Sequence, residues 1–209
     1  MQLGPNAFQA LERLGIAERL RQTAFFPDAL VMLDALDGTE LTRMDLGDTF
    51  RVRFGQPYCV IHRNDLHGLL LDACRTLPDV ALETGRNIVS FEQDAGSVVI
   101  RCDDGTAYEG SALIGADGLR SVVRSQLLGD GVPRVAGQVA YRGVVPVEAI
   151  TDRTHANSVV LWVGHNMHMV QYRLRGGAVM NTVAVVESED LRLGLTDTVD
   201  PGMFTLTGN

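Results

Sequence analysis

Residues 111–124, which read SALIGADGLRSVVR, limit the fold of this chain more than any other segment. Their apolar start predicts a short strand, the Ala-Asp-Gly sequence predicts a tight turn, and the rest predicts a helix with Ser121 and Arg124 in its first turn. Strand, turn and helix in this order are typical of α/β proteins, which present backbone N–H groups at the carboxyl edge of a sheet. The spacing alone leaves two readings open, a nucleotide or phosphate site and an ordinary structural turn.

The amino-acid composition argues against several classes of binding partner. The 209 residues are 45% hydrophobic, which suffices for one substantial core or for two lobes that share an interface. The net charge of -8 argues against sequence-independent binding of nucleic acid, and all 18 basic residues are arginine. No apolar run approaches the roughly 18 residues that span a bilayer, and no leader opens the chain, so we expect no membrane association. Cys59, Cys74 and Cys102 lack metal-ligand or CxxC spacing, which predicts buried thiols in a reducing cytoplasm and no metal site.

Three helical segments are expected from apolar spacing. Residues 5–21 place apolar side chains near helical spacing with Gly15 interrupting, which predicts one kinked helix or two short ones. A second helix follows Asn64, its expected N-cap, and ends near Arg75. A third is expected over residues 119–128.

The remaining periodicity is that of strands. Asp-Gly and Ala-Gly pairs between alternating segments predict hairpin turns, and the last four strands, with little helix between them, predict an antiparallel sheet in a second lobe. Residues 190–209 have weak periodicity and predict an irregular tail. The expected strands are residues 29–33, 40–45, 57–61, 80–83, 88–94, 97–103, 106–109, 111–115, 139–147, 158–163, 167–174 and 178–187.

Five segments in a fixed order resemble FAD-dependent aromatic-ring monooxygenases of the salicylate hydroxylase and 3-hydroxybenzoate 6-hydroxylase type, which share the p-hydroxybenzoate hydroxylase fold. Together they span most of residues 1–187. They read LGPNAFQALERLGI, CVIHRNDLHGLLLDAC, GADGLRSVVR, AYRGVVP and VGHNMHMVQYRLRGG.

The resemblance implies an α/β fold, α+β overall, in two parts. Residues 1–27 and 58–136 would form a partial Rossmann-like FAD-binding domain, and residues 28–57 and 137–189 an antiparallel β-sheet domain for the substrate, with 190–209 as the tail. Complete members open with a strand and a Gly-x-Gly-x-x-Gly turn that this sequence lacks, so the chain resembles an internal fragment.

Arg63 is the first candidate for FAD binding. A guanidinium just ahead of a helix, near free N–H groups, suits a pyrophosphate, and the matching arginine of the family contacts FAD. The alternative from the residues alone is a surface arginine that pairs with Asp65.

The Asp-Gly motif supplies further candidates. Asp117 is an anion and cannot itself receive a phosphate, which leaves a ribose or ribityl hydroxyl, a bridging water or Arg63 as its partners. We hypothesise that it orients Arg63 or Arg124 around the pyrophosphate while Gly118 lets the backbone approach. Ile88 matches a position whose backbone borders the adenine in the family, although an ordinary core residue is an equal alternative.

His168 and Tyr172 are the candidate catalytic residues. Four apart on a strand, they project from one face together with Val170. An imidazole and a phenol on one face can orient a phenolic substrate and help to remove its hydroxyl proton. The alternative is a half-buried histidine beside a tyrosine of the sheet, but the resemblance implies that the pair lines the substrate pocket.

The implied reaction is hydroxylation of a 3-hydroxybenzoate-like or salicylate-like acid. In the family, NAD(P)H reduces FAD, O2 forms a flavin C4a-hydroperoxide, and the distal oxygen attacks the activated ring. The resemblance further implies a cytoplasmic enzyme, usually a homodimer. Two alternatives stay open: a noncatalytic remnant without stable FAD binding, and a flavoprotein of the same fold with other redox chemistry.

Overall fold

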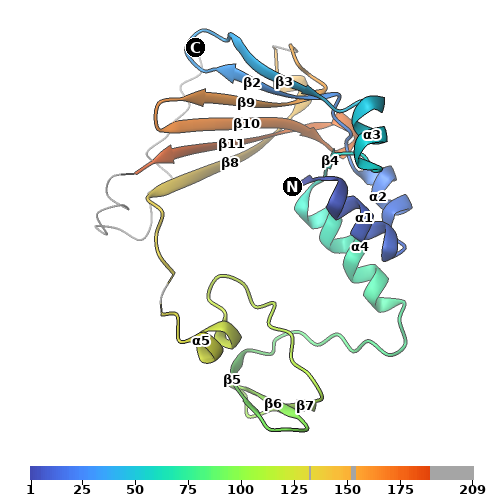
Figure 1. The fold of residues 1–209 in the computed structure, drawn as a ribbon, viewed down its shortest axis with the longest axis vertical. Coiled ribbons are helices and arrows are strands. Elements are labelled where there is room, and N and C mark those ends of the chain that lie inside the picture. Colours follow the sequence, from blue (N-terminus) through green and yellow to red (C-terminus); the bar gives the residue numbers. More distant parts are fainter. Residues whose placement is uncertain (132, 152–153, 189–209) are drawn as a thin grey trace. The chain divides into compact units, whose positions relative to one another are not determined.

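The computed structural model describes residues 1–131, 133–151 and 154–188 (Figure 1). These residues form two compact units. Unit 1 contains Met1–Pro78 and the described residues from Ala136 onward, and unit 2 is Asp79–Val135. The predicted division into a FAD-binding part and a substrate-binding part is a functional one and stays a prediction.

The helical part of unit 1 consists of α1 (Pro5–Arg13), α2 (Ala17–Thr23) and α4 (Arg63–Arg75). Gly15 separates α1 from α2 with a φ of 72°, which confirms two short helices in place of one kinked helix. Phe8, Leu20 and Ile61 are fully buried where these helices pack together. The short strand β1 (Gln2–Leu3) pairs antiparallel with β4 (Cys59–Val60) beside them.

Two local features differ from the prediction. The N-cap of α4 is His62, whose ring Nδ1 accepts a hydrogen bond from the backbone N–H of Asn64 at 3.3 Å, so Asn64 itself lies inside the helix. Helix α3 (Asp48–Phe54) was not expected, because none of its residues is buried and it therefore has no apolar period. It ends at Gly55, which adopts a left-handed conformation.

The main sheet of unit 1 has six strands in the order β3-β2-β9-β10-β11-β8 (Figure 1). All neighbours are antiparallel except β2 and β9, which are parallel, so the sheet is mixed. The expected strands of this sheet are confirmed, each within two residues of its predicted ends. Their bounds are β2 Ala29–Asp34, β3 Glu40–Asp45, β8 Gln138–Pro146, β9 Ser158–Gly164, β10 Met167–Leu174 and β11 Val179–Glu187.

Unit 2 is a three-stranded meander with one helix. Its elements are β5 (Ile88–Gln93), β6 (Val98–Cys102), β7 (Ala107–Gly110) and α5 (Val122–Leu128). The Gln126 side chain joins α5 to β5, because its amide donates to the carbonyl of Phe91 and accepts from the N–H of Phe91. Phe91, Val98 and Val123 form the small core.

Two predicted strands are wrong, and both lie in unit 2. Residues 80–83 and 111–115 have no ladder partner among the described residues, and Ile114 is 88% exposed. An apolar run only permits a strand, whereas a neighbouring backbone is needed to form one. The third helix starts at Val122 in place of residue 119. The predicted tail, residues 190–209, lies outside the described residues.

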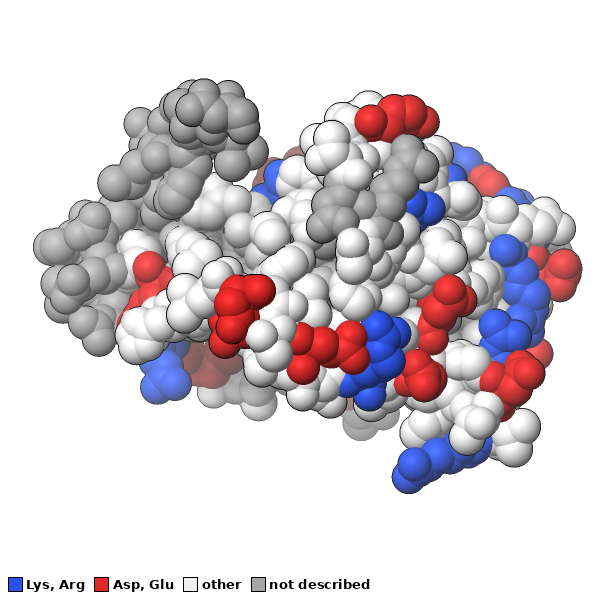
Figure 2. Space-filling view, turned by 90° about the horizontal axis from the view of Figure 1, so that it is seen from above, with Lys and Arg blue, Asp and Glu red and all other residues white. Residues whose placement is uncertain are grey.

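The surface carries charges of both signs. Acidic and basic side chains are interspersed over the face drawn in Figure 2, so that face has no extended basic patch. Within residues 1–131, 133–151 and 154–188, no helix is long and apolar enough to cross a membrane.

Candidate functional site

One face of the six-stranded sheet carries both candidate catalytic residues, and we call it the site face. His168, Val170 and Tyr172 alternate along β10, and the pairing register places Leu161 and Val183 on either side of Val170. The strand β10 therefore places His168 and Tyr172 on one face, as predicted. Their assignment to catalysis stays a prediction.

His168 borders an apolar hollow on the site face. The imidazole is half-buried between Val163 and Val185, its partners on β9 and β11. The hollow has a volume of about 430 Å³, and an adjoining hollow of about 370 Å³ continues over β2 and β3. Leu161 and Val170 line both hollows, so the apolar surface is continuous. Gln138 and Asn166 join His168 as polar groups in the lining of the first hollow. Apolar walls with a few polar groups are typical of sites for small organic ligands.

Tyr172 is more enclosed and is only 6% exposed. Burial raises the pKa of its hydroxyl, and the positive charge of Arg142 partly opposes this shift. The amino group of Met1 donates to the carbonyl of Ile61 at 2.6 Å and lies 3.5 Å from the Tyr172 hydroxyl, to which it also donates. The Tyr172 hydroxyl is therefore a neutral hydrogen-bonding group at ordinary pH.

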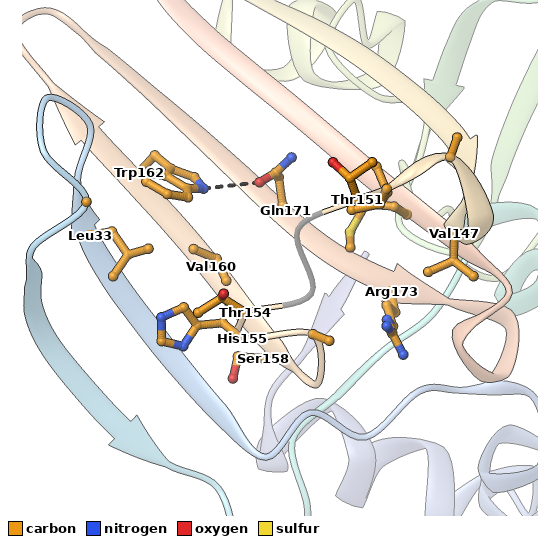
Figure 3. A pocket seen from close by; sticks show the side chains of 15 residues that line it. Leu33, Val147, Thr151, Thr154, His155, Ser158, Val160, Trp162, Gln171 and Arg173 are labelled. Carbon is orange, nitrogen blue, oxygen red and sulfur yellow. Dashed lines mark hydrogen bonds between the residues drawn. The ribbon is translucent and has the colours of Figure 1, made fainter.

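The opposite face of the sheet holds a separate hollow of about 430 Å³ (Figure 3). On the wall of this hollow, Trp162 of β9 donates its indole N–H to the side-chain oxygen of Gln171 on the neighbouring strand β10 at 3.1 Å, and Arg173 lines the hollow farther along β10. Sequence reasoning missed this site. The sequence signal for this hollow is the pair Gln171 and Arg173, which alternate with Tyr172 along β10 and therefore point away from the site face.

Arg63 is the first residue of α4 and is exposed. The alternative partner, Asp65, instead accepts two hydrogen bonds of 3.1 Å from Arg175. No ion pair engages Arg63 in the part of the chain that the structure describes. Its guanidinium is thus available at the amino end of a 13-residue helix, where anions are favoured.

Asp117 caps its own helix. One carboxylate oxygen accepts from the Ser121 hydroxyl, and the other accepts from the N–H groups of Val122 and Val123 at 2.7 and 3.2 Å. The Ser121 hydrogen bond is the main cause that lowers the pKa of this carboxyl group. The N–H groups of this helix are therefore used by the protein itself.

Arg124 has partners other than Asp117. It donates to the carbonyl of Leu119 at 2.8 Å, and its Nε lies 2.8 Å from a carboxylate oxygen of Asp130. Gly118 has a φ of 79°, and the space in which a side chain would stand is open. Ile88, the first residue of β5, is half-buried opposite Cys102. Arg63 belongs to unit 1 and these residues to unit 2, so the joint FAD site stays a prediction.

Comparison with known proteins identifies the family. The sequence model of one protein family, described as FAD binding domain, matches residues 2–188. Two curated relatives are a 3-hydroxybenzoate 6-hydroxylase of Polaromonas naphthalenivorans (strain CJ2), 46% identical over 188 residues, and a 3-hydroxybenzoate 6-hydroxylase 1 of Aquipseudomonas alcaligenes, 42% identical over 188 residues. These matches cover 90% of this chain and 47% and 48% of the relatives. The chain thus spans about half the length of the curated relatives it matches.

Solved structures agree on the fold. A salicylate hydroxylase in a substrate complex superposes with a TM-score of 0.79 at 23% identity, over 96% of this chain and 51% of that one. HpxO of Klebsiella pneumoniae, in complex with FAD and uric acid, gives a TM-score of 0.77 at 23% identity, over 90% and 47% of the two chains. The predicted resemblance to FAD-dependent aromatic hydroxylases is confirmed, and the chain belongs to the FAD binding domain family.

Proposed function

We propose that this chain forms part of a FAD-dependent monooxygenase that hydroxylates a phenolic aromatic acid of the 3-hydroxybenzoate or salicylate type, with NAD(P)H and O2 as co-substrates. The observation that carries the proposal is the site face, on which His168 and Tyr172 flank Val170 beside a continuous apolar surface. The 46% identity to a 3-hydroxybenzoate 6-hydroxylase favours this substrate class.

The two side chains can prepare a phenol for attack. The half-buried imidazole of His168 is suited to accept the hydroxyl proton of a phenol that lies on the hollow. The neutral Tyr172 hydroxyl can donate a hydrogen bond to the same ligand. Removal of the proton raises the electron density of the ring, which favours transfer of an electrophilic oxygen to it. The apolar side chains of the hollow would cover part of the ring that lies on them.

The residues of this chain fit FAD in part. Arg63 offers an exposed guanidinium at the amino end of α4, which suits a pyrophosphate, and Gly118 exposes open backbone at a turn. Asp117 is saturated by its own helix, so its contribution would be to hold the turn in shape. FAD, when bound, would supply the redox chemistry. In this proposal residues 1–27 and 58–136 serve the cofactor, and residues 28–57 and 137–189 serve the substrate.

The test uses the chain within a version that has the full length of its curated relatives, purified with added FAD. We expect retained flavin absorbance after gel filtration, and NAD(P)H oxidation that 3-hydroxybenzoate or salicylate accelerates with formation of a hydroxylated product. A colourless chain that binds no flavin would instead support the noncatalytic alternative. Flavin retention without any effect of phenolic acids would favour a flavoprotein with other redox chemistry, and either result would contradict the proposal.

A further inference from the structure

Two polar side chains of the site face have no hydrogen-bond or ion-pair partner among the described residues. The first is Asn181 of β11, which pairs directly with Tyr172 of β10 and therefore stands beside it on the same face. Its side-chain Nδ2 is buried, and no described residue accepts a hydrogen bond from it. A buried N–H group without a partner destabilises the fold, so its persistence calls for an acceptor from outside these elements.

The second side chain is Arg142 of β8. It pairs with Val183 of β11, which places it on the site face one step diagonal from Asn181, at a typical separation of about 7–8 Å. The side chain is exposed, and none of the described carboxylates forms an ion pair with it. Burial is the main cause of the raised pKa of Tyr172 and of the lowered pKa of the Met1 amino group, and the positive charge of Arg142 acts on both in the lowering direction, as expected of a cation near this part of the face.

The chemistry of these two groups matches a carboxylate. A guanidinium and an amide NH2 group are donors, whereas a carboxylate is an acceptor with two oxygens that can serve both at once. Val170 and Val183 lie between this pair and His168, and Val170 also lines the hollow that His168 borders. An aromatic ring over these two valines would turn a carboxylate toward β8 and β11 and leave its hydroxyl group toward His168.

We propose that Arg142 and Asn181 bind the carboxylate of the aromatic substrate and thereby select aromatic acids over neutral phenols. The inference rests on the proposed function of the site face as the substrate site. It adds the two residues that recognise the acid group, in contrast to His168 and Tyr172, which act on the phenol.

A matched control lies in the same sheet. Arg173 follows Tyr172 in β10, so it points to the opposite face, and its Nε is likewise buried without a hydrogen-bond partner among the described residues. Arg173→Gln therefore removes the same charge from the same sheet without touching the site face.

The experiment measures binding by calorimetry or ligand-observed NMR, with the 209-residue chain and without FAD. The probes are 3-hydroxybenzoate and 3-hydroxybenzamide, which differ only in the charged group. We expect the acid to bind at least about tenfold more tightly, the typical effect of a charged hydrogen-bonded partner. Arg142→Gln should abolish this preference, and Arg142→Lys should keep part of it. Asn181→Leu should lower the affinity for the acid several-fold. Arg173→Gln should leave it unchanged.

A preference for the acid that survives Arg142→Gln, an equal loss in Arg173→Gln, or no binding of the acid to the unaltered chain would overturn the inference. Circular dichroism of each variant checks that the sheet is intact. The assay needs no flavin, so Arg142-dependent binding in a chain that never retains FAD would sustain this inference while the proposed function fails. Turnover of 3-hydroxybenzoate by the flavin-loaded Arg142→Gln variant with an unchanged KM would instead sustain the proposed function and overturn this inference.

Discussion

His168 and Tyr172 differ in their surroundings although they share a face. His168 stands at the border of an open hollow, whereas Tyr172 is enclosed by Val60, Val159 and Leu174. The exposed border is the place for a group that exchanges protons with a ligand and then with solvent. The enclosed position suits a group that keeps one protonation state, because burial disfavours the charged form.

Replacement of His168 is the corresponding prediction. In the flavin-loaded protein, we expect His168→Gln to lower the rate of substrate hydroxylation by about 100-fold or more, since the general base is lost. The measurement is the rate of product formation, with NAD(P)H oxidation followed in the same assay. His165→Gln is the control, because His165 is exposed in the turn between β9 and β10. Equal rates for the two variants would show that His168 is only a residue of the sheet.

Elements of the fold depend on a few backbone positions and caps. The periodicity of residues 5–21 indicated the helices, and the structure adds why they are separate: Gly15 adopts a conformation that L side chains avoid. The apolar run of residues 111–115 has strand-like composition but no neighbour to pair with among the described residues, so composition alone misled there.

Gly15→Ala tests the break between α1 and α2. No atom lies within 4 Å of the added Cβ, so the expected cost is that of the backbone conformation alone. We expect the free energy of unfolding to fall by about 1–2 kcal/mol in urea denaturation. Gly15→Asn should cost less, because asparagine tolerates positive φ more readily. An unchanged stability in Gly15→Ala would contradict the positive φ at this residue.

Asp117→Ala tests the cap of α5. Loss of its three hydrogen bonds should speed hydrogen exchange of the Val122 and Val123 amides several-fold, whereas Asp79→Ala, at an exposed carboxylate of the same unit, should not. The pKa of Asp117 is lowered in the folded chain, so the protection is present above the ordinary carboxyl pKa and is lost as pH falls through the lowered value. Protection that does not change with this residue would show that the cap is dispensable.

The molecule as a whole should lose stability in alkali. Burial raises the pKa of both Tyr58 and Cys59 to about 12, from ordinary values of 10.0 and 9.0. Between these ordinary values and pH 12 the unfolded chain binds fewer protons than the folded chain, so the free energy of unfolding falls as pH rises. Each group contributes a slope of up to about 1.4 kcal/mol per pH unit.

Urea denaturation across this pH range measures the slope. Cys59→Ala and Tyr58→Phe should each flatten it, even where they lower stability at neutral pH. Cys74→Ala is the matched control, since that thiol is only half-buried. A slope that neither Cys59→Ala nor Tyr58→Phe changes would mean that these groups titrate in the folded chain as they do in water.

The local sequence pattern was sufficient to predict most of the helices and strands and the shared face of His168 and Tyr172. A repeat of two residues in strands or of 3.6 residues in helices can be recognised within a short stretch of sequence. The resemblance of five ordered segments was sufficient for the family. Neither could reveal that β2 pairs parallel with β9 or that Asp65 binds Arg175 in place of Arg63. Nor could they reveal that Asn181 stands beside Tyr172, with Arg142 diagonal to Asn181. Those outcomes join residues that are far apart in the chain, and they are decided by which strands meet and in which register.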